Sequence, residues 1–222
     1  MQNGNTQKEE DKFSEFVKRN RKGIYIIMGI IIFLFAGTIV YLSLEAGLRK
    51  KAIAEAEELN SRYAELHSSL KEEDSAEKVN ALLEDLNAFV KGKRGYAGAR
   101  GWTIIAQIHS GREDWQNAEE SWRNAAKTGA KTYLAPAAFF NAAVAAENQG
   151  KIDDAIELLE KSVSYKFDFP SAPRAQFSIG RLNEQRGDIS AAVSAYRAIL
   201  TNWPNIETWA NLAQSRIIAI EE

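Results

Sequence analysis

The sequence predicts an all-α protein in which a single N-terminal transmembrane helix is followed by a helical hairpin and a solenoid of stacked helix pairs. Three observations predict this fold class. The chain holds only 4 prolines among 222 residues and is rich in alanine, leucine, glutamate and lysine, which favour helices. Residues 24–44 carry no charge, and a pattern of small and bulky residues recurs at a fixed spacing in the second half of the chain.

Composition and charge exclude several classes of protein. The chain is 45% hydrophobic and 26% charged with a formal net charge of −2, so it is neither disordered nor a nucleic-acid binder by overall charge. It has no cysteine, which excludes disulfides, thiol chemistry and a thiolate metal site. The absence of cysteine is compatible with an oxidising compartment.

Residues 24–44, IYIIMGIIIFLFAGTIVYLSL, are predicted to form a transmembrane helix. At ~1.5 Å per residue this run covers the ~30 Å hydrocarbon core of a bilayer. Tyr25 and Tyr41 lie near its ends, where aromatic rings prefer the membrane interface. A cleaved signal peptide is the alternative, but its apolar part is only about 7–15 residues long and small residues follow it. Here the longer run is followed by EAGLRKK, so we expect an uncleaved anchor.

Basic residues on the two sides of the apolar run predict its orientation. The residues before it are Lys8, Lys12, Lys18, Arg19, Arg21 and Lys22, and those just after it are Arg49, Lys50 and Lys51. Because flanks rich in lysine and arginine stay in the cytoplasm, residues 1–23 are predicted to be a cytoplasmic tail and the C-terminal part to lie outside. Phe13, Phe16 and Val17 have helical spacing, and they either lie on the inner membrane surface or belong to a solvated tail.

Residues 45–91 are predicted to form a helical stalk or hairpin. A heptad seam runs along its first helix, at Leu48, Ala52, Ala56, Leu59, Tyr63, Leu66 and Leu70. The second helix has an apolar side of its own, at Val79, Leu82, Leu83, Leu86, Phe89 and Val90. A dimeric coiled coil is the alternative, but about three heptads are marginal for independent pairing. Since a complementary helix follows directly, we expect the two helices to pack on each other and on their neighbour.

The segment 92–101 is predicted to be a flexible connector, because glycines stand at positions 92, 95, 98 and 101. It also holds the basic residues Lys93, Arg94 and Arg100. No strand precedes it and no Gly-Lys-Ser or Gly-Lys-Thr ends it, so it does not match a phosphate-binding loop. A basic contact with a membrane or a partner is the alternative to a simple connector.

A repeat of helix pairs occupies residues 102–222. Its recurring positions are 37 residues apart in both steps, with alanine at Ala118, Ala155 and Ala192, a bulky residue at Trp122, Leu159 and Tyr196, and a small one at Ala106, Ala143 and Gly180. Two antiparallel helices approach closely only where facing side chains are small, and bulky residues a turn away fill the remaining space. Each pair leaves an apolar face that the next pair covers, so the copies are expected to stack.

The turn inside each copy differs in the first one. Gly150 and Gly187 fall at this turn in the second and third copies, where a left-handed residue ends the first helix. Glu113 stands at the same place in the first copy. We therefore expect the first turn to be looser.

These features resemble tetratricopeptide repeats. The matching residues are Trp102, Ala106, Ala118, Trp122, Ala125, Ala143, Gly150, Ala155, Leu159, Gly180, Gly187, Ala192, Tyr196 and Pro204. The usual period is about 34 residues, so a spacing of 37 predicts longer turns between copies. The resemblance implies that the segment after Pro204 is a capping helix and that residues 45–91 are a degenerate additional copy.

An α-solenoid of this kind offers a surface to a protein partner and has no built-in chemistry. No nucleophile motif or zinc spacing is present, so we predict no enzyme activity, no cofactor and no metal site. The resemblance implies that the first helix of each pair lines the binding groove. The expected partner-binding residues are Arg100, Thr103, Gln107, Phe140, Val144, Arg174, Phe177 and Arg181, with Ala137 among the same slots. For Phe140 and Phe177, packing between neighbouring repeats is the alternative.

The order of a short tail, one anchor, a helical stalk and a compact repeat domain resembles the YfgM-type ancillary subunits of the bacterial Sec translocon. The resemblance implies a single-pass inner membrane protein whose repeat domain lies in the periplasm. It further implies an adaptor that links translocon subunits to a membrane-anchored periplasmic chaperone and to exported chains, with no nucleic acid or small molecule as partner. The alternative is a scaffold or assembly factor for another envelope complex, such as a cell-wall, secretion or motility apparatus.

Overall fold

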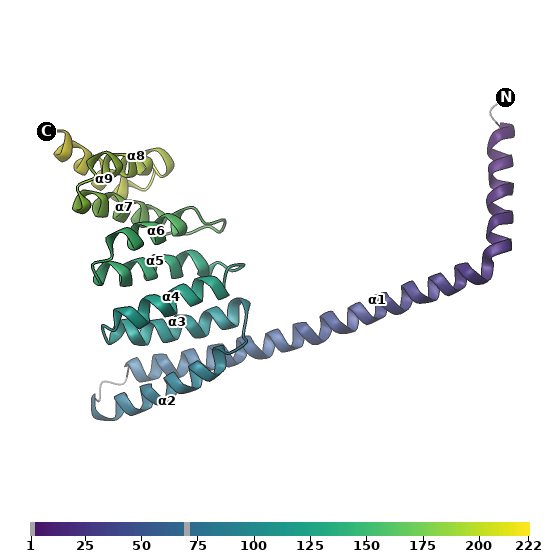
Figure 1. Ribbon diagram of the computed structural model, residues 1–222, viewed down its shortest axis with the longest axis horizontal. Coiled ribbons are helices and arrows are strands. Elements are labelled where there is room, and N and C mark those ends of the chain that lie inside the picture. The colour runs from purple at the N-terminus through teal and green to yellow at the C-terminus, as the bar shows by residue number, and fades with distance from the viewer. Residues whose placement is uncertain (1–2, 69–71) are drawn as a thin grey trace. The chain divides into compact units, whose positions relative to one another are not determined.

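The computed structural model describes residues 3–68 and 72–222, and within these residues the regular secondary structure consists of nine helices (Figure 1). The predicted all-α fold class is therefore confirmed. The chain divides into two compact units, Met1–Lys51 and Ala52–Glu222. Residues 1–2 of the predicted tail and Leu70, the last residue of the predicted heptad seam, lie outside the described residues.

The first unit consists of the N-terminal part of helix α1 (Asn3–Ser68). Its apolar run has no core to pack against, because every side chain from Tyr25 to Leu44 is exposed. The stretch Ser14–Ser68 is long and apolar enough to cross a membrane, with a mean hydropathy of 2.5 in its most apolar window, and none of that window is buried inside the protein.

The second unit begins with a hairpin formed by residues 52–68 of α1 and by α2 (Glu72–Val90). Ala56 and Leu59 of the heptad seam are buried in one cluster with Leu82 and Leu86 of α2. An ion pair at 2.8 Å between Arg62 and Asp85 also joins the two helices. The centre of the seam is thus buried within the chain itself, with Ala52, Tyr63 and Leu66 partly buried against the same cluster. Leu48, its first predicted member, lies in the first unit and is 70% exposed.

Helix α3 (Gly95–Gly111) begins inside the segment predicted to be a flexible connector, so only residues 91–94 connect it to α2. Two of the glycines allow close packing. A Cβ atom on Gly98 would lie 2.7 Å from the carbonyl oxygen of Lys93, and one on Gly101 would lie 2.7 Å from a methyl group of Val90. This corrects the predicted connector, because Gly98 and Gly101 lie inside α3 and allow it to pack closely against residues 89–93 of the same chain.

Three helix pairs and a final helix complete the second unit (Figure 1). The pairs are α3 with α4 (Trp115–Thr128), α5 (Leu134–Asn148) with α6 (Ile152–Val163), and α7 (Ala172–Arg186) with α8 (Ile189–Asn202), and α9 (Glu207–Glu221) ends the series. Each helix from α2 onward contacts the next one, and the first helices of neighbouring pairs also meet, as α3 does with α5 and α7 with α9. This is the predicted stacking of copies.

The recurring small residues lie where the paired helices come closest. Ala118, Ala155 and Ala192 are fully buried. A Cβ atom on Gly180 would lie only 2.4 Å from the ring of Tyr196, so the larger ring of the third copy requires glycine at this slot. The sequence pattern of small and bulky residues therefore reflects direct packing between the two helices of a copy.

The turns inside the three copies have the same geometry. Glu113 has a φ of 56°, close to the 74° of Gly150 and the 83° of Gly187. In each copy the residue after this position donates its backbone N–H to a carbonyl five residues earlier, at 2.9–3.0 Å. The expectation of a looser first turn was wrong, because Glu113 adopts the left-handed conformation that the turn demands although it is not glycine.

Candidate protein-binding surface

The predicted binding residues come from the first helices of the pairs, and polar contacts join these helices to one another. Arg181 on α7 donates to Glu147 on α5 at 2.7 Å, and Arg216 on α9 forms an ion pair with Glu184 on α7. Residues 52–68 of α1 belong to the same series, since Glu57 lies 3.6 Å from Arg100 Nε on α3. We call the surface formed by the eight predicted residues and Ala137 the first-helix face.

On α3, the three predicted residues differ in accessibility. Thr103 is 9% exposed, and its hydroxyl donates to the carbonyl of Ala99 at 2.9 Å, so it serves packing within the helix. Arg100 is partly buried, and its Nε has no hydrogen-bond partner in the described residues, only the more distant carboxylate of Glu57. Gln107 is half-buried and retains some accessible surface.

On α5, Phe140 is buried and Val144 is exposed. The centroid of the Phe140 ring lies 5.9 Å from that of Phe169 and 5.1 Å from the guanidinium of Arg174. Phe169 comes from the loop between α6 and α7, which is the long inter-repeat turn that the spacing of 37 residues predicted. This loop covers Phe140, so only 8% of the residue remains exposed.

On α7, Phe177 is half-buried and packs against Tyr196 and Trp209, with ring centroids 5.1 and 5.6 Å apart. It therefore ties α7 to α8 and α9. Arg174 and Arg181 are exposed. The part of the first-helix face that a partner can reach is accordingly centred on Gln107, Val144, Arg174 and Arg181. Thr103 is bonded within its own helix, and Phe140 packs against the loop before α7 and against Arg174.

Tyr133 lies beside the first-helix face and was missed in the sequence. It is 63% exposed in the turn before α5, and its ring centroid is 6.1 Å from that of Tyr96. Tyr96 donates its hydroxyl to Glu57 at 2.8 Å, and burial, followed by this hydrogen bond, raises the pKa of Tyr96. The predicted binding positions all lie on helices, whereas Tyr133 lies in a turn, where the helical period does not single it out.

Glu147 and Glu184 occupy the same slot in the second and third copies. Hydrogen bonding from Arg216 holds the pKa of Glu184 below its usual range, although partial burial opposes this shift, and Tyr196 donates its hydroxyl to the same carboxylate. Ser110 has this slot in the first copy and accepts a hydrogen bond from Trp122 Nε1 at 3.3 Å. In the first and third copies, the residue at this position therefore accepts a hydrogen bond from the bulky residue of the second helix.

Within the described part of the chain, no three histidine, aspartate or glutamate side chains converge as they would around a metal ion. His109 Nδ1 lies 3.0 Å from Asp114 Oδ2 at the first intra-copy turn, and His67 stacks on Tyr63. Both histidines thus have local partners within their own helices or turns.

Stacked helix pairs with small residues at their closest contacts define an α-solenoid repeat protein, a class that presents its surface to protein partners. The family model described as tetratricopeptide repeat matches residues 105–167 and 148–205. These residues therefore match the sequence pattern of tetratricopeptide repeats. Tetratricopeptide repeats generally mediate protein–protein interactions and are typically non-catalytic scaffolds.

The chain is similar to a TPR repeat-containing protein of Treponema pallidum (strain Nichols), with 35% identity over 145 residues. The match covers 64% of this chain and 60% of that relative, so the chain spans less than two thirds of the relative's length.

Among solved structures, TPR-like repeats of a Podosopora anserina putative kinesin light chain match with 18% identity and a TM-score of 0.54. This match covers 74% of this chain and 86% of that one and supports the fold alone. The MamA protein matches with 25% identity and a TM-score of 0.45, over 55% of this chain and 62% of that one.

Proposed function

We propose that this protein is a membrane-anchored adaptor whose tetratricopeptide repeats bind protein partners on the extracytoplasmic side of a bacterial inner membrane. The exposed apolar run from Tyr25 to Leu44 carries the proposal. Transfer of apolar surface out of water is worth about 25 cal/mol per Å², so a helix with this many exposed apolar side chains favours a hydrocarbon environment.

The charges beside this run support the orientation. Lys18, Arg19, Arg21 and Lys22 precede it directly, whereas Arg49 after it is paired with Glu45 at 2.6 Å. Positive flanks are retained in the cytoplasm. The tail of residues 1–23 is therefore cytoplasmic in this proposal, and the unit Ala52–Glu222 faces the periplasm.

The partners that we propose are subunits of the Sec translocon, a membrane-anchored periplasmic chaperone and exported chains. The support is the order of a short tail, one apolar helix, a hairpin and a stack of repeats, together with an accessible surface that combines Val144 with the cation Arg174. Such a mixed apolar and cationic surface suits a protein partner with acidic and apolar groups.

Site-specific photo-cross-linking in intact cells tests the partners. A photoreactive amino acid at Gln107 or Val144 should cross-link to translocon or chaperone components, and the same probe at Glu120 on α4 or Glu157 on α6 should not. These control residues are exposed on second helices. Cross-links from the first-helix face to components of another envelope complex would favour the alternative function, a scaffold for that complex. The absence of any specific adduct at Gln107 and Val144 would contradict an adaptor that uses this face.

The absence of cysteine allows a clean test of topology. A single cysteine replacing Ser14 should react with a membrane-impermeant maleimide only after the cells are permeabilised, whereas one replacing the exposed Lys131 should react in spheroplasts. The reverse pattern would place the repeats in the cytoplasm.

A further inference from the structure

Four of the five residues from Lys18 to Lys22 are basic, and they lie just before the uncharged run. The four are Lys18, Arg19, Arg21 and Lys22, and all of them are exposed on α1. The fifth, Asn20, donates its side-chain amide to the carbonyl of Phe16 at 2.9 Å. In the described part of the chain no carboxylate forms an ion pair with any of the four cations. Their charge is therefore available to an anion outside the protein.

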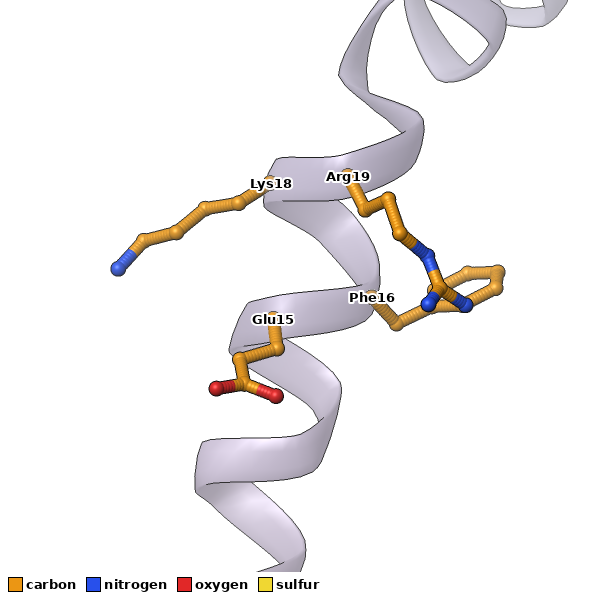
Figure 2. Close-up of a pocket in the computed structure, with 4 residues that line it drawn as sticks. All are labelled: Glu15, Phe16, Lys18 and Arg19. Carbon is orange, nitrogen blue, oxygen red and sulfur yellow. The ribbon is translucent and has the colours of Figure 1, made fainter.

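Glu15 carries the described carboxylate nearest in sequence to the four cations, and it forms no ion pair with them. Glu15 lies in a shallow surface hollow together with Phe16, Lys18 and Arg19 (Figure 2). Its side chain makes no ion pair with Lys18 or Arg19, although both stand at helical spacings that permit one. By contrast, Arg49 at the other end of the apolar run is paired with Glu45 at 2.6 Å. Among the described residues, four unpaired cations thus precede the run, whereas only Lys50 and Lys51 stand unpaired just after it.

The spacing of the four cations matches one layer of a membrane. At ~1.5 Å per residue, the helix advances about 6 Å from Lys18 to Lys22. A bilayer of about 40–45 Å with a ~30 Å hydrocarbon core has a headgroup layer of about 5–8 Å on each side. With residues 24–44 in the hydrocarbon core, Lys22, Arg21 and Arg19 lie about 3–8 Å beyond Ile24 and fall in this headgroup layer. Lys18 lies about 9 Å beyond Ile24, and its long side chain reaches back to the layer.

The side chains at this level point to different sides of the helix. In Figure 2, Lys18 projects to one side, while Arg19 and the ring of Phe16 project to the other. At 3.6 residues per turn, the four cations cover about half of the helix circumference, so they reach more than one neighbouring lipid. Phe16 is 54% exposed, and an aromatic ring at this depth prefers the membrane interface.

We propose that Lys18, Arg19, Arg21 and Lys22 form a binding site for the phosphate groups of anionic phospholipids. The inference rests on the proposed function, because it requires residues 24–44 to span the membrane. The arginine guanidinium groups can donate two hydrogen bonds to one phosphate, and the lysines add point charges. In a zwitterionic lipid the headgroup amine offsets the phosphate charge, so the site selects lipids with net negative charge.

Lipid retention by the full-length protein tests this site. The protein is reconstituted into bilayers of equal parts phosphatidylglycerol and phosphatidylcholine, extracted with a mild detergent, and its bound lipids are quantified by mass spectrometry. We expect several-fold enrichment of phosphatidylglycerol for the native chain. A variant with Lys18→Gln, Arg19→Gln, Arg21→Gln and Lys22→Gln should retain the two lipids near their bulk ratio.

A matched control removes the same charge elsewhere. Its substitutions, at exposed cations without an ion pair, are Lys91→Gln, Arg94→Gln, Lys127→Gln and Lys131→Gln. This control should keep the enrichment of the native chain. Raising the salt concentration from about 0.01 M to about 1 M shortens the Debye length from ~30 Å to ~3 Å and should reduce the enrichment without any substitution.

Three results would overturn the lipid site: no enrichment for the native chain, equal enrichment in the fourfold variant, or loss of a co-purifying acidic protein in that variant with unchanged lipids. A carbonate wash of the membranes separates this failure from failure of the proposed function. Release of the native chain by carbonate would contradict the membrane anchor itself. Retention in the membrane without lipid enrichment would contradict the lipid site alone.

Discussion

At the scale of single residues, Gly180 and Tyr196 in the third copy stand where Ala143 and Leu159 stand in the second. The larger ring is accommodated by removing the Cβ atom opposite to it, since that atom would lie 2.4 Å from the ring. All four residues are buried. The two copies therefore fill the same space with different pairs of residues, which is how cores tolerate substitution when the total volume is kept.

This exchange predicts coupling between the two positions. Gly180→Ala should destabilise the protein by about 1–3 kcal/mol, because the new methyl group overlaps the Tyr196 ring. The double variant Gly180→Ala with Tyr196→Leu reproduces the pair of the second copy, and it should be at least about 1 kcal/mol more stable than the sum of the two single effects predicts. Urea unfolding of the native chain, the two single variants and the double variant measures this coupling energy. Additive effects of the two substitutions would contradict the direct contact between Gly180 and Tyr196.

Glu113 predicts a stabilising substitution. A non-glycine residue at positive φ carries a steric penalty of about 1–2 kcal/mol, which glycine avoids. Glycine also increases the conformational entropy of the unfolded chain, and this offsets part of the gain in stability. Glu113→Gly should raise the free energy of unfolding by about 0.5–1 kcal/mol, as measured by urea denaturation. Glu120→Gly, on an exposed helix position, is the control and should lower stability by about 1 kcal/mol. A destabilised Glu113→Gly variant would show that the side chain makes a contribution beyond the turn.

At the scale of helices, ion pairs connect the first helices of successive copies. Glu147 with Arg181 joins α5 to α7, and Glu184 with Arg216 joins α7 to α9. The two glutamates are 37 residues apart, so the same slot performs the same task in two copies. The final helix α9 is attached by this pair together with buried Ala213 and Ile217.

The pair with Arg216 predicts a pH dependence. Because hydrogen bonding from Arg216 lowers the pKa of Glu184 in the folded state, the pair stabilises the fold above the ordinary glutamate pKa of 4.5. That contribution is lost as the pH falls through the lowered pKa. Since Arg216 is half-exposed, Glu184→Gln should cost only about 0.5–1 kcal/mol at pH 7.

Thermal unfolding between pH 7 and pH 3 measures the effect. The difference in stability between the native chain and Glu184→Gln should narrow on acidification, while Glu120→Gln, at an exposed site without an ion pair, should follow the native chain throughout. A Glu184→Gln difference that stays constant with pH would contradict the assigned role of the charge.

At the scale of the whole molecule, the division into two units predicts what can be separated. The chain from Ala52 to Glu222 contains the complete hairpin core, including Ala56 and Leu59. It should be soluble without detergent, monomeric in size-exclusion chromatography and cooperative in thermal unfolding. A stable dimer would instead favour the coiled-coil interpretation of the heptad seam.

A shorter chain that begins at residue 72 is the matched comparison. It lacks the α1 segment and exposes the otherwise fully buried Leu82 and Leu86. Each large apolar side chain contributes about 1.5–3 kcal/mol when buried, so this chain should melt at a clearly lower temperature. Equal melting temperatures would show that the α1 segment is dispensable for the repeat domain.

Most of the fold could be predicted because its signals are periodic and local. The repeat of Ala118, Ala155 and Ala192 identified the stacked pairs, and the uncharged run at 24–44 identified the long apolar helix. The prediction of a flexible connector was wrong because a glycine in a sequence indicates either a flexible turn or a close approach between helices. Gly98 and Gly101 permit close packing inside α3, and a sequence shows the missing side chain without showing the neighbour that needs the space.

The sequence by itself determined the helices, their pairing and the slots at which they touch, because the helical period fixes the direction of each side chain around its axis. Only the tertiary structure decided which of these slots reach solvent. Phe140 is covered because the loop after α6 returns across α5, and Arg181 is held at the surface by Glu147 from another copy. These contacts join residues about 30 positions apart, and their geometry depends on the path of loops and the distance between copies, which no local period encodes.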